Sequence, residues 1–179
     1  MAVDANALTS LVNVRAYLQF PATDTSKDTL LENLINRASA AIESDCGREF
    51  KTRTQTETHY LDEATRRLMV KQFPITAITS ITDDGTALTA DELADCENRE
   101  TYIKLDTERE GKVDVVYTAG YATIPADLEQ ACILLVMYYY KMDVANFSTV
   151  FAESGAVFRP SRLPPHMAFL TDKYRKISF

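Results

Sequence analysis

Histidines, cysteines and carboxylates are the residues of this chain whose types could perform chemistry, and their spacing gives them few partners. His59 and His166 have no second metal ligand or acid/base partner at helical or hairpin spacing. Cys46, Cys96 and Cys132 are far apart and odd in number, which favours reduced thiols over a disulfide framework or a zinc site. We therefore expect no metal, no cofactor and no catalytic residue.

Two groups of acids remain as candidates for carboxylate chemistry: Asp83 with Asp84, and Asp106 with Glu108 and Glu110. Their spacing lacks the alternating ligands and closing glutamate of an EF-hand, so they fit turn residues and a solvated acidic face better than a cation site. Motifs for a nucleophile elbow, a phosphate loop or a zinc hydrolase are also missing from the sequence. The enzyme alternative is a small carboxylate-dependent one, which would need a pocket that brings His59 near two acids.

Charge is divided unevenly along the chain. The 179 residues carry 26 acids and 19 bases, for a net charge of -7. Residues 1–144 hold 24 of the acids and 14 of the bases, whereas residues 145–179 hold 2 acids and 5 bases. The stretch 83–114 alone holds 11 acids against 4 bases. Because gripping a phosphate backbone requires clustered Lys and Arg, this acidic body excludes a protein that binds nucleic acid over a wide surface.

The hydropathy of the sequence indicates in which cellular compartment the protein is made. The longest uncharged apolar run, from Ala131 to Tyr140, has ten residues, whereas a membrane helix needs about 20. The first residues, MAVDANALTSLVNV, place an acid where a signal peptide would carry positive charge. We therefore expect synthesis in the cytoplasm and no membrane partner.

Three segments have the periodicity of helices: residues 9–19, 26–46 and 125–143. Thr25 to Asp28 has the spacing of a capping box for the second, and Gly47 suits its left-handed end. The third is apolar nearly all round, because a stripe of Ile133, Leu134, Met137 and Tyr140 lies opposite its main apolar stripe. Such a helix needs cover on all sides, and a neighbouring subunit would supply part of it.

Between the second and third helices the period changes to two. Thr52, Thr54, Thr56 and Thr58 alternate with polar residues, so this strand has strong β propensity but little apolar surface. We therefore expect it at a sheet edge, available for pairing between chains. Further strands are expected at residues 67–71, 75–82, 101–105 and 112–117, with a turn at Asp83 to Gly85 and another at Glu110-Gly111 before the last strand.

These elements predict an α+β fold. A bundle of three to four helices would carry a small antiparallel β region inserted at residues 50–118, within a domain spanning residues 1–143. Residues 144–179 would form an extended C-terminal arm with a terminal helix, whose start is indicated by Leu163-Pro164-Pro165.

The most specific segment runs from Val113 to Asp127, and together with the next four residues it has the pattern V-x-Y-x-A-G-Y followed by I-P-x-D-L-x-x-A. It resembles the bacteriophage head-tail connector family, also called adaptor or head-completion proteins. Three more segments are similar to that family in the same order: Ile42 to Phe50 (IESDCGREF), Phe73 to Ile81 (FPITAITSI), and Arg162-Leu163-Pro164 with Leu170 and Tyr174-Arg175. The resemblance covers about residues 8–143 and the last helix, whereas Val144 to Pro160 is longer than the family pattern.

The resemblance implies a structural virion protein and no enzymatic activity. Proteins of this family form a ring, twelve-fold by expectation, between the portal and the tail or neck, and the ring extends the DNA channel after packaging. The implied partners are further copies of the chain, the portal protein, a neck, stopper or tail protein, and double-stranded DNA that passes without specific binding. The alternative within the virion is a stopper or tail terminator, although the long amphipathic helices count against such β-dominated proteins.

The same resemblance suggests where these contacts would lie. Channel-facing residues would be Asp83, Asp84, Glu108 and Glu110. Subunit contacts would involve Thr52, Thr54, Thr56, Thr58, Ile133, Leu134, Met137 and Tyr140. Portal contacts would come from Phe151, Phe158, Arg159, Arg162, Arg175, Lys176 and Phe179. The alternative for this segment is a C-terminal helix that folds back on its own domain.

Overall fold

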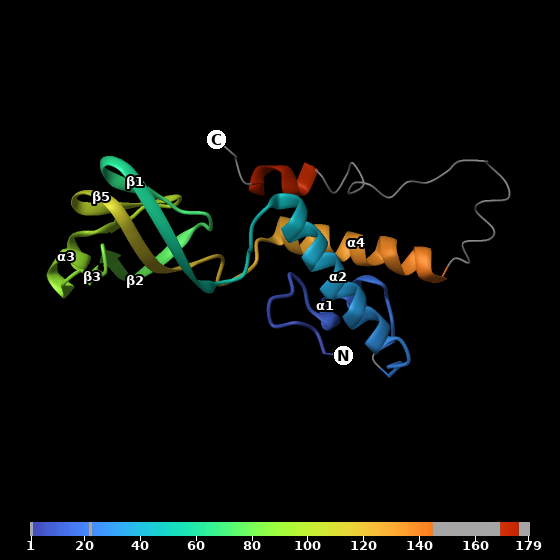
Figure 1. Ribbon diagram of the computed structural model, residues 1–179. Helices are drawn as coiled ribbons and strands as arrows, with labels where there is room; N and C mark the ends of the chain where they lie inside the picture. The colour runs from blue at the N-terminus through green and yellow to red at the C-terminus, as the bar shows by residue number, and fades with distance from the viewer. Residues whose placement is uncertain (1, 22, 145–168, 176–179) are drawn as a thin grey trace. The chain divides into compact units, whose positions relative to one another are not determined.

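Helices and strands are segregated along the chain, with every long strand between α2 and α4 (Figure 1). The computed structural model describes residues 2–21, 23–144 and 169–175. These residues divide into two units: a helical unit, Met1–Arg48 with Ile124–Phe179, and a sheet unit, Glu49–Thr123. The fold is therefore α+β, with the strands inserted between helices as expected. The predicted boundary at residue 143 stays a prediction, because residues 145–168 lie outside the described part.

The helical unit contains α1 (Leu11–Tyr17), α2 (Asp28–Cys46) and α4 (Ala126–Val144), followed by a 3₁₀ helix, η1 (Asp172–Tyr174). The ends of the first three differ from the predicted ranges by at most two residues. Ser10 caps α1, because its hydroxyl accepts a hydrogen bond from the backbone N–H of Asn13 at 3.2 Å. Gly47 ends α2 with φ of 67°, as its position predicts.

The predicted capping box at the start of α2 is wrong. The residue before the helix is Lys27, which makes no side-chain capping hydrogen bond. The Asp28 carboxylate pairs instead with Arg15, whose Nη1 lies 2.5 Å from Oδ1. A long-range ion pair to α1 has therefore replaced the local cap.

Apolar residues of α2 and α4 form the core of the helical unit. On α2 the buried side chains include Leu31, Leu34, Ile35, Ala38 and Ile42, which is the predicted stripe. On α4 they are Leu128, Ala131, Cys132, Ile133, Leu135 and Val136, and these extend around more than one face of the helix.

The sheet unit is built on two long antiparallel strands, β1 (Arg53–Met69) and β5 (Tyr102–Ala119). The shorter strands are β2 (Ile75–Asp83), β3 (Thr86–Ala87) and β4 (Glu97–Asn98), and a short helix, α3 (Ala90–Asp95), precedes β4. The strand order is β1-β5-β2-β3, and β4 pairs with the other half of β5. All pairings are antiparallel.

The strands predicted at 101–105 and 112–117 are one continuous strand, and the strand predicted at 67–71 is the end of β1. Register shifts near Leu61 and Thr65 bend the β1–β5 ribbon without ending it (Figure 1). Gly111, which predicts a turn, lies inside β5 with φ of 83°. Odd-numbered residues on both halves of β5 consequently face one core: Ile103, Leu105, Val113, Val115, Tyr117 and Ala119.

Candidate functional site

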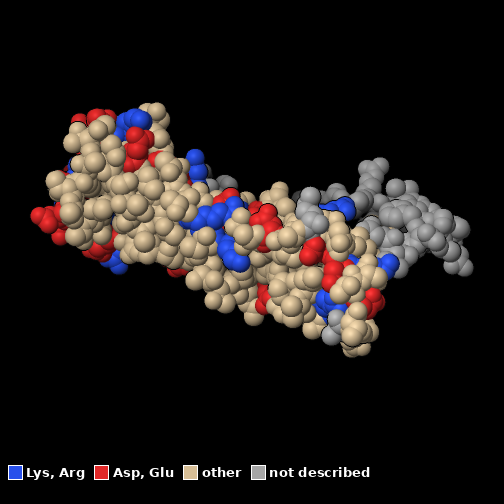
Figure 2. All heavy atoms as spheres, turned by 90° about the horizontal axis from the view of Figure 1, so that it is seen from below, with Lys and Arg blue, Asp and Glu red and all other residues tan. Residues whose placement is uncertain are grey.

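The four acids predicted to face a channel lie at one end of the sheet unit. Asp83 and Asp84 come from the turn between β2 and β3, and Glu108 and Glu110 come from the bent part of β5. All four line one pocket with a volume of about 420 Å³. Its other lining residues are Thr86, Ala87, Leu88, Glu92 and Arg109. Figure 2 shows acidic side chains gathered at the end of the sheet unit where α3 and β3 lie in Figure 1.

The turn is fixed against β5 by backbone geometry. Asp84 and Gly85 have φ of 43° and 85°, which is the positive-φ pair that a two-residue hairpin favours. The Asp84 N–H donates to the carbonyl of Lys112 at 2.9 Å, and the Lys112 N–H donates to Asp84 Oδ1 at 3.1 Å. The turn predicted from Asp84-Gly85 is therefore present, and it places the Asp83 and Asp84 carboxylates beside β5.

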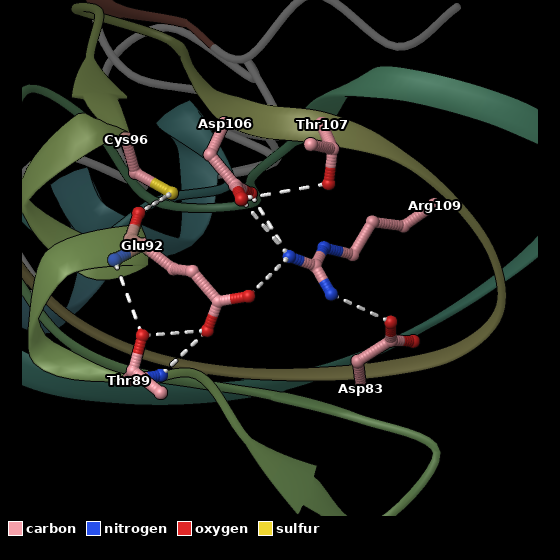
Figure 3. Close-up of polar contacts among 7 residues, drawn as sticks. All are labelled: Asp83, Thr89, Glu92, Cys96, Asp106, Thr107 and Arg109. Carbon is pink, nitrogen blue, oxygen red and sulfur yellow. Dashed lines mark hydrogen bonds and ion pairs between the residues drawn. The ribbon is translucent and has the colours of Figure 1, made fainter.

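Arg109 is the centre of this acidic end (Figure 3). Its guanidinium lies 2.9 Å from Asp83 and 3.0 Å from Asp106, and Glu92 of α3 lies 3.7 Å away. The side chain is 13% exposed, so these contacts are only partly screened by water. The hydrogen bond to Asp83, then that to Asp106, raise the pKa of Arg109 further above its ordinary value. A half-buried cation thus holds a turn, a helix and a strand together.

Helix α3 holds Glu92 in place through a capping box that the sequence analysis did not identify. The Thr89 N–H donates to Glu92 Oε2 at 2.8 Å, and the Glu92 N–H donates to the Thr89 hydroxyl at 3.4 Å (Figure 3). These backbone and hydroxyl bonds lower the pKa of Glu92. The signal was visible as Thr-x-x-Glu before Leu93, but the α3 segment is short and lies between strands.

The acidic end carries surplus negative charge. Arg109 faces three carboxylates, and Asp84, Glu108 and Glu110 are exposed around the same pocket. Among the described residues, no group of three or more His, Cys, Asp or Glu side chains is arranged to hold a metal ion. A field of this sign repels phosphate at close range.

Strand β1 is an edge strand, as its composition predicts. It pairs with β5 on one side, and within the described part of the chain no strand pairs with its other side. Thr52, Thr54, Thr56 and Thr58 are all exposed, together with Tyr60, whose exposure is 75%. This face therefore offers hydroxyl and methyl groups to solvent.

The opposite face of β1 is anchored by a buried polar pair that sequence reasoning missed. Glu57 is 8% exposed and accepts a hydrogen bond from the hydroxyl of Tyr117 on β5. The Glu57 carboxylate also accepts the Lys71 N–H at 3.0 Å, and the Tyr117 hydroxyl accepts the Gln72 N–H at 3.2 Å. Burial, and next the bond to Glu57, raise the pKa of Tyr117. Polar contacts thus anchor the first half of this strand, whereas Leu68 near its end is buried in the apolar core.

His59 is not surrounded by acids in the way that the enzyme alternative requires. Its Nε2 lies 3.5 Å from Glu57, and His59 does not line the acidic pocket described above. Burial lowers the pKa of His59, although the Glu57 charge opposes this effect. His166 lies outside the described residues.

The predicted subunit-contact stripe on α4 is covered within the chain at one of its four positions. Ile133 is 8% exposed, whereas Leu134, Met137 and Tyr140 are half-buried. The Tyr140 ring also lies edge-on to Phe20, with 5.8 Å between the ring centroids.

Of the residues predicted to contact the portal, only Arg175 is described. Its guanidinium lies 2.7 Å from Asp45 at the end of α2 and 3.3 Å from Asp172. Phe151, Phe158, Arg159, Arg162, Lys176 and Phe179 lie outside the described residues.

The sequence profile of the head completion protein family matches residues 7–177. The chain belongs to the head completion protein family. No individually curated protein is similar enough in sequence to count as a relative. No helix in the described part of this head completion protein is long and apolar enough to cross a membrane.

Solved structures share the head completion fold. One, "Neck of empty GTA particle computed with C6 symmetry", has a chain with a TM-score of 0.65 and 19% identity, covering 100% of this chain and 96% of that one. A chain of "Neck of native GTA particle computed with C12 symmetry" has a TM-score of 0.60 and 20% identity, covering 100% of this chain and 94% of that one. A chain of "Virion of native gene transfer agent (GTA) particle" has a TM-score of 0.62 and 19% identity, with the same two coverages. At these identities the likeness establishes the fold.

Proposed function

We propose that this chain is a structural protein of the virion neck. Twelve copies form a ring between the portal and the tail or neck, and the ring extends the DNA channel after packaging. The observation that carries the proposal is the family match over residues 7–177. Full-length similarity in fold to chains from particle necks computed with six-fold and twelve-fold symmetry supports it. In this account the protein is made in the host cytoplasm, acts in the virion and performs no catalysis.

Removing the chain from the particle tests this role. A particle genome that lacks the coding sequence should yield heads that fill with DNA but carry no tail and lose their DNA. Supplying the protein from a plasmid should restore tailed particles. Tailed, infectious particles at normal yield without the protein would contradict the proposal.

The acidic end of the sheet unit is proposed to face the channel. Asp83, Asp84, Glu108 and Glu110 would then line the path of the DNA and keep it from binding the wall. The test uses the exposed acids, changed together as Asp84→Asn, Glu108→Gln and Glu110→Gln. We expect assembled rings with these changes to retain DNA more strongly at low salt. Glu100→Gln, at an exposed acid whose carbonyl accepts the Ile75 N–H at the other end of β2, should have little effect.

Contacts between copies are proposed at the free edge of β1, through Thr52, Thr54, Thr56 and Thr58, and along α4. On α4, Leu134, Met137 and Tyr140 would make the contact directly, and Ile133 would support it from within the chain. Leu134→Lys with Met137→Lys should leave a folded protein that closes no rings, whereas Lys141→Ala on the same helix should still assemble. Normal rings from the double variant would exclude the α4 contact.

The C-terminal residues are proposed to reach the portal through the aromatic side chains Phe151, Phe158 and Phe179 and the bases Arg159, Arg162, Arg175 and Lys176. The Arg175 side chain stays 46% exposed while it is paired with Asp45, so it would meet the portal without leaving that ion pair. Deleting residues 145–179 should abolish portal binding by a protein that stays folded. Loss of solubility would indicate that the segment serves its own domain instead.

A further inference from the structure

The end of the chain docks on the helical unit through charge pairs and one buried residue. Arg175 contacts Asp45 at the end of α2, and Lys173 forms an ion pair with Asp127 in the first turn of α4. Between them the segment lies beside the end of α2 and the start of α4 (Figure 1). The docking site is therefore made by two helix ends that meet at one point of the helical unit.

Thr171 fixes the position of the segment on this site. It is fully buried, and its carbonyl accepts a hydrogen bond from the Cys46 thiol at 3.9 Å. Burial raises the pKa of the Cys46 thiol to about 11, so the thiol keeps its proton at neutral pH. By contrast Phe169, two residues earlier, is 82% exposed. Docking within one chain thus leaves a large aromatic side chain in water.

The chain between α4 and this segment is much longer than the docking requires. From Val144 back to Asp127 along α4 is about 26 Å at a rise of 1.5 Å per residue. The 24 residues from 145 to 168 have a maximum reach of about 80 Å at roughly 3.3 Å each. Covalent connection therefore does not decide whose docking site the segment occupies.

We propose that in the assembled ring the segment Phe169–Arg175 docks on the helical unit of the neighbouring copy, at that copy's Asp45, Cys46 and Asp127. This inference rests on the ring proposed above. The contacts are the same as in one chain, so exchange sacrifices none of them. Each exposed ion pair contributes only about 0–1 kcal/mol, so the two ion pairs by themselves do not commit the segment to its own chain. In the ring, the Phe169 side chain, which is 82% exposed on its own chain, would be available for contact with a second copy.

Zero-length cross-linking of mixed isotopes tests the exchange with the native sequence. Equal amounts of unlabelled and ¹⁵N-labelled protein are unfolded together, refolded, assembled into rings and treated with a water-soluble carbodiimide. The reagent activates the Asp127 carboxylate, and the Lys173 amine attacks it, forming an amide and releasing the urea. With exchange, about half of the Lys173–Asp127 cross-links in rings should join a light peptide to a heavy one.

Two controls show whether a mixed-isotope Lys173–Asp127 cross-link reports exchange between copies. Lys104 and Glu97 lie 2.7 Å apart on the paired strands β5 and β4, so their cross-link should always join peptides of like isotope. Lys173→Gln should remove the diagnostic cross-link and leave the Lys104–Glu97 cross-link unchanged.

The outcomes separate the exchange from the proposed function. Closed rings in which every Lys173–Asp127 cross-link joins like isotopes would overturn the exchange and leave the neck role intact. Closed rings without that cross-link would overturn the exchange as well, because the segment would then have left this site. If electron microscopy of the mixture with the particle's portal showed no closed rings, the ring proposal would be contradicted, and the exchange with it.

Discussion

The helical unit and the sheet unit use different interactions to hold their parts together. In the helical unit α2 and α4 meet through aliphatic side chains, and Leu128 and Leu135 are fully buried among them. In the sheet unit the apolar core is built mainly from β5 and β2, with Leu68 from the end of β1, while the first half of the inner face of β1 carries Glu57 and His59. Polar contacts such as Glu57–Tyr117 attach β1 to that core.

This difference bears on how each unit meets other molecules. A strand fixed from inside by directional hydrogen bonds keeps its outer face and free edge in a defined position without apolar surface there. The helical unit instead has half-buried apolar residues on α4, where contact with another copy removes further surface from water. The sheet unit is suited to presenting charge and backbone, and the helical unit to packing.

The largest expected effect concerns the backbone at the base of the sheet unit. A Cβ on Gly120 would lie 2.6 Å from the carbonyl oxygen of Lys51, and φ there is 113°. Gly120→Ala should therefore lower the free energy of unfolding of this unit by about 4 kcal/mol, from clash and strain together. Gly85→Ala also has positive φ but open space around its Cβ, so it should cost only about 1 kcal/mol. Denaturant unfolding of both variants measures the difference, and equal losses would show that the close approach is unimportant.

The apolar core of the helical unit gives the next effect. Leu135→Ala should lower the free energy of unfolding by about 3 kcal/mol, because a fully buried leucine leaves a cavity. Val12→Ala on α1 is the control, since Val12 is 74% exposed and should change stability by less than about 0.5 kcal/mol. Hydrogen exchange should locate the loss in α2 and α4. A loss spread equally over the sheet unit would contradict the separation of the two units.

The polar anchor of β1 is tested by Tyr117→Phe. The change removes one hydroxyl from Glu57 and leaves the Gln72 N–H without its acceptor, which should cost about 2 kcal/mol. Tyr60→Phe, at an exposed tyrosine on the outer face of the same strand, should be neutral. Amide exchange in β1 measures both variants. If β1 were held by apolar packing alone, the two tyrosines would behave alike.

The smallest effect is a pH dependence confined to the sheet unit. Because burial lowers the pKa of His59 in the folded state, the unfolded chain binds the proton more tightly. The contribution of His59 to stability should therefore be constant above about pH 6.5 and fall as the pH drops below it. His59→Gln should remove this dependence, whereas His166→Gln should keep it. A wild-type protein whose stability rises on acidification would contradict the direction of the shift.

Local signals predict much of this fold, and long-range contacts account for what they miss. The apolar stripes of α2 and α4, the glycine after Cys46 and the Asp84-Gly85 turn act within a few residues, so the sequence indicates them directly. The turn predicted at Gly111 is wrong. Glycine marks a turn in most sequences, whereas here it adopts a positive φ inside a continuous strand, β5. The partner of β1 is set by pairing across many residues, which no local pattern encodes.

The candidate site was predictable in composition but incompletely in arrangement. The density of acids predicts a charged surface, and the structure brings Asp83, Asp84, Glu108 and Glu110 to one pocket. The role of Arg109 was not predictable, because its carboxylate partners come from β2, α3 and β5. The Glu57–Tyr117 pair joins residues 60 positions apart, and only the fold brings them together.

The most direct test of the proposed role is an electron cryomicroscopy reconstruction of the neck of the particle that encodes this chain. The account predicts a closed ring of twelve copies directly below the portal, with Asp84, Glu108 and Glu110 facing the DNA. A neck that contains no copies of the chain would contradict the proposed function. A ring with these acids on its outer rim would contradict the channel assignment.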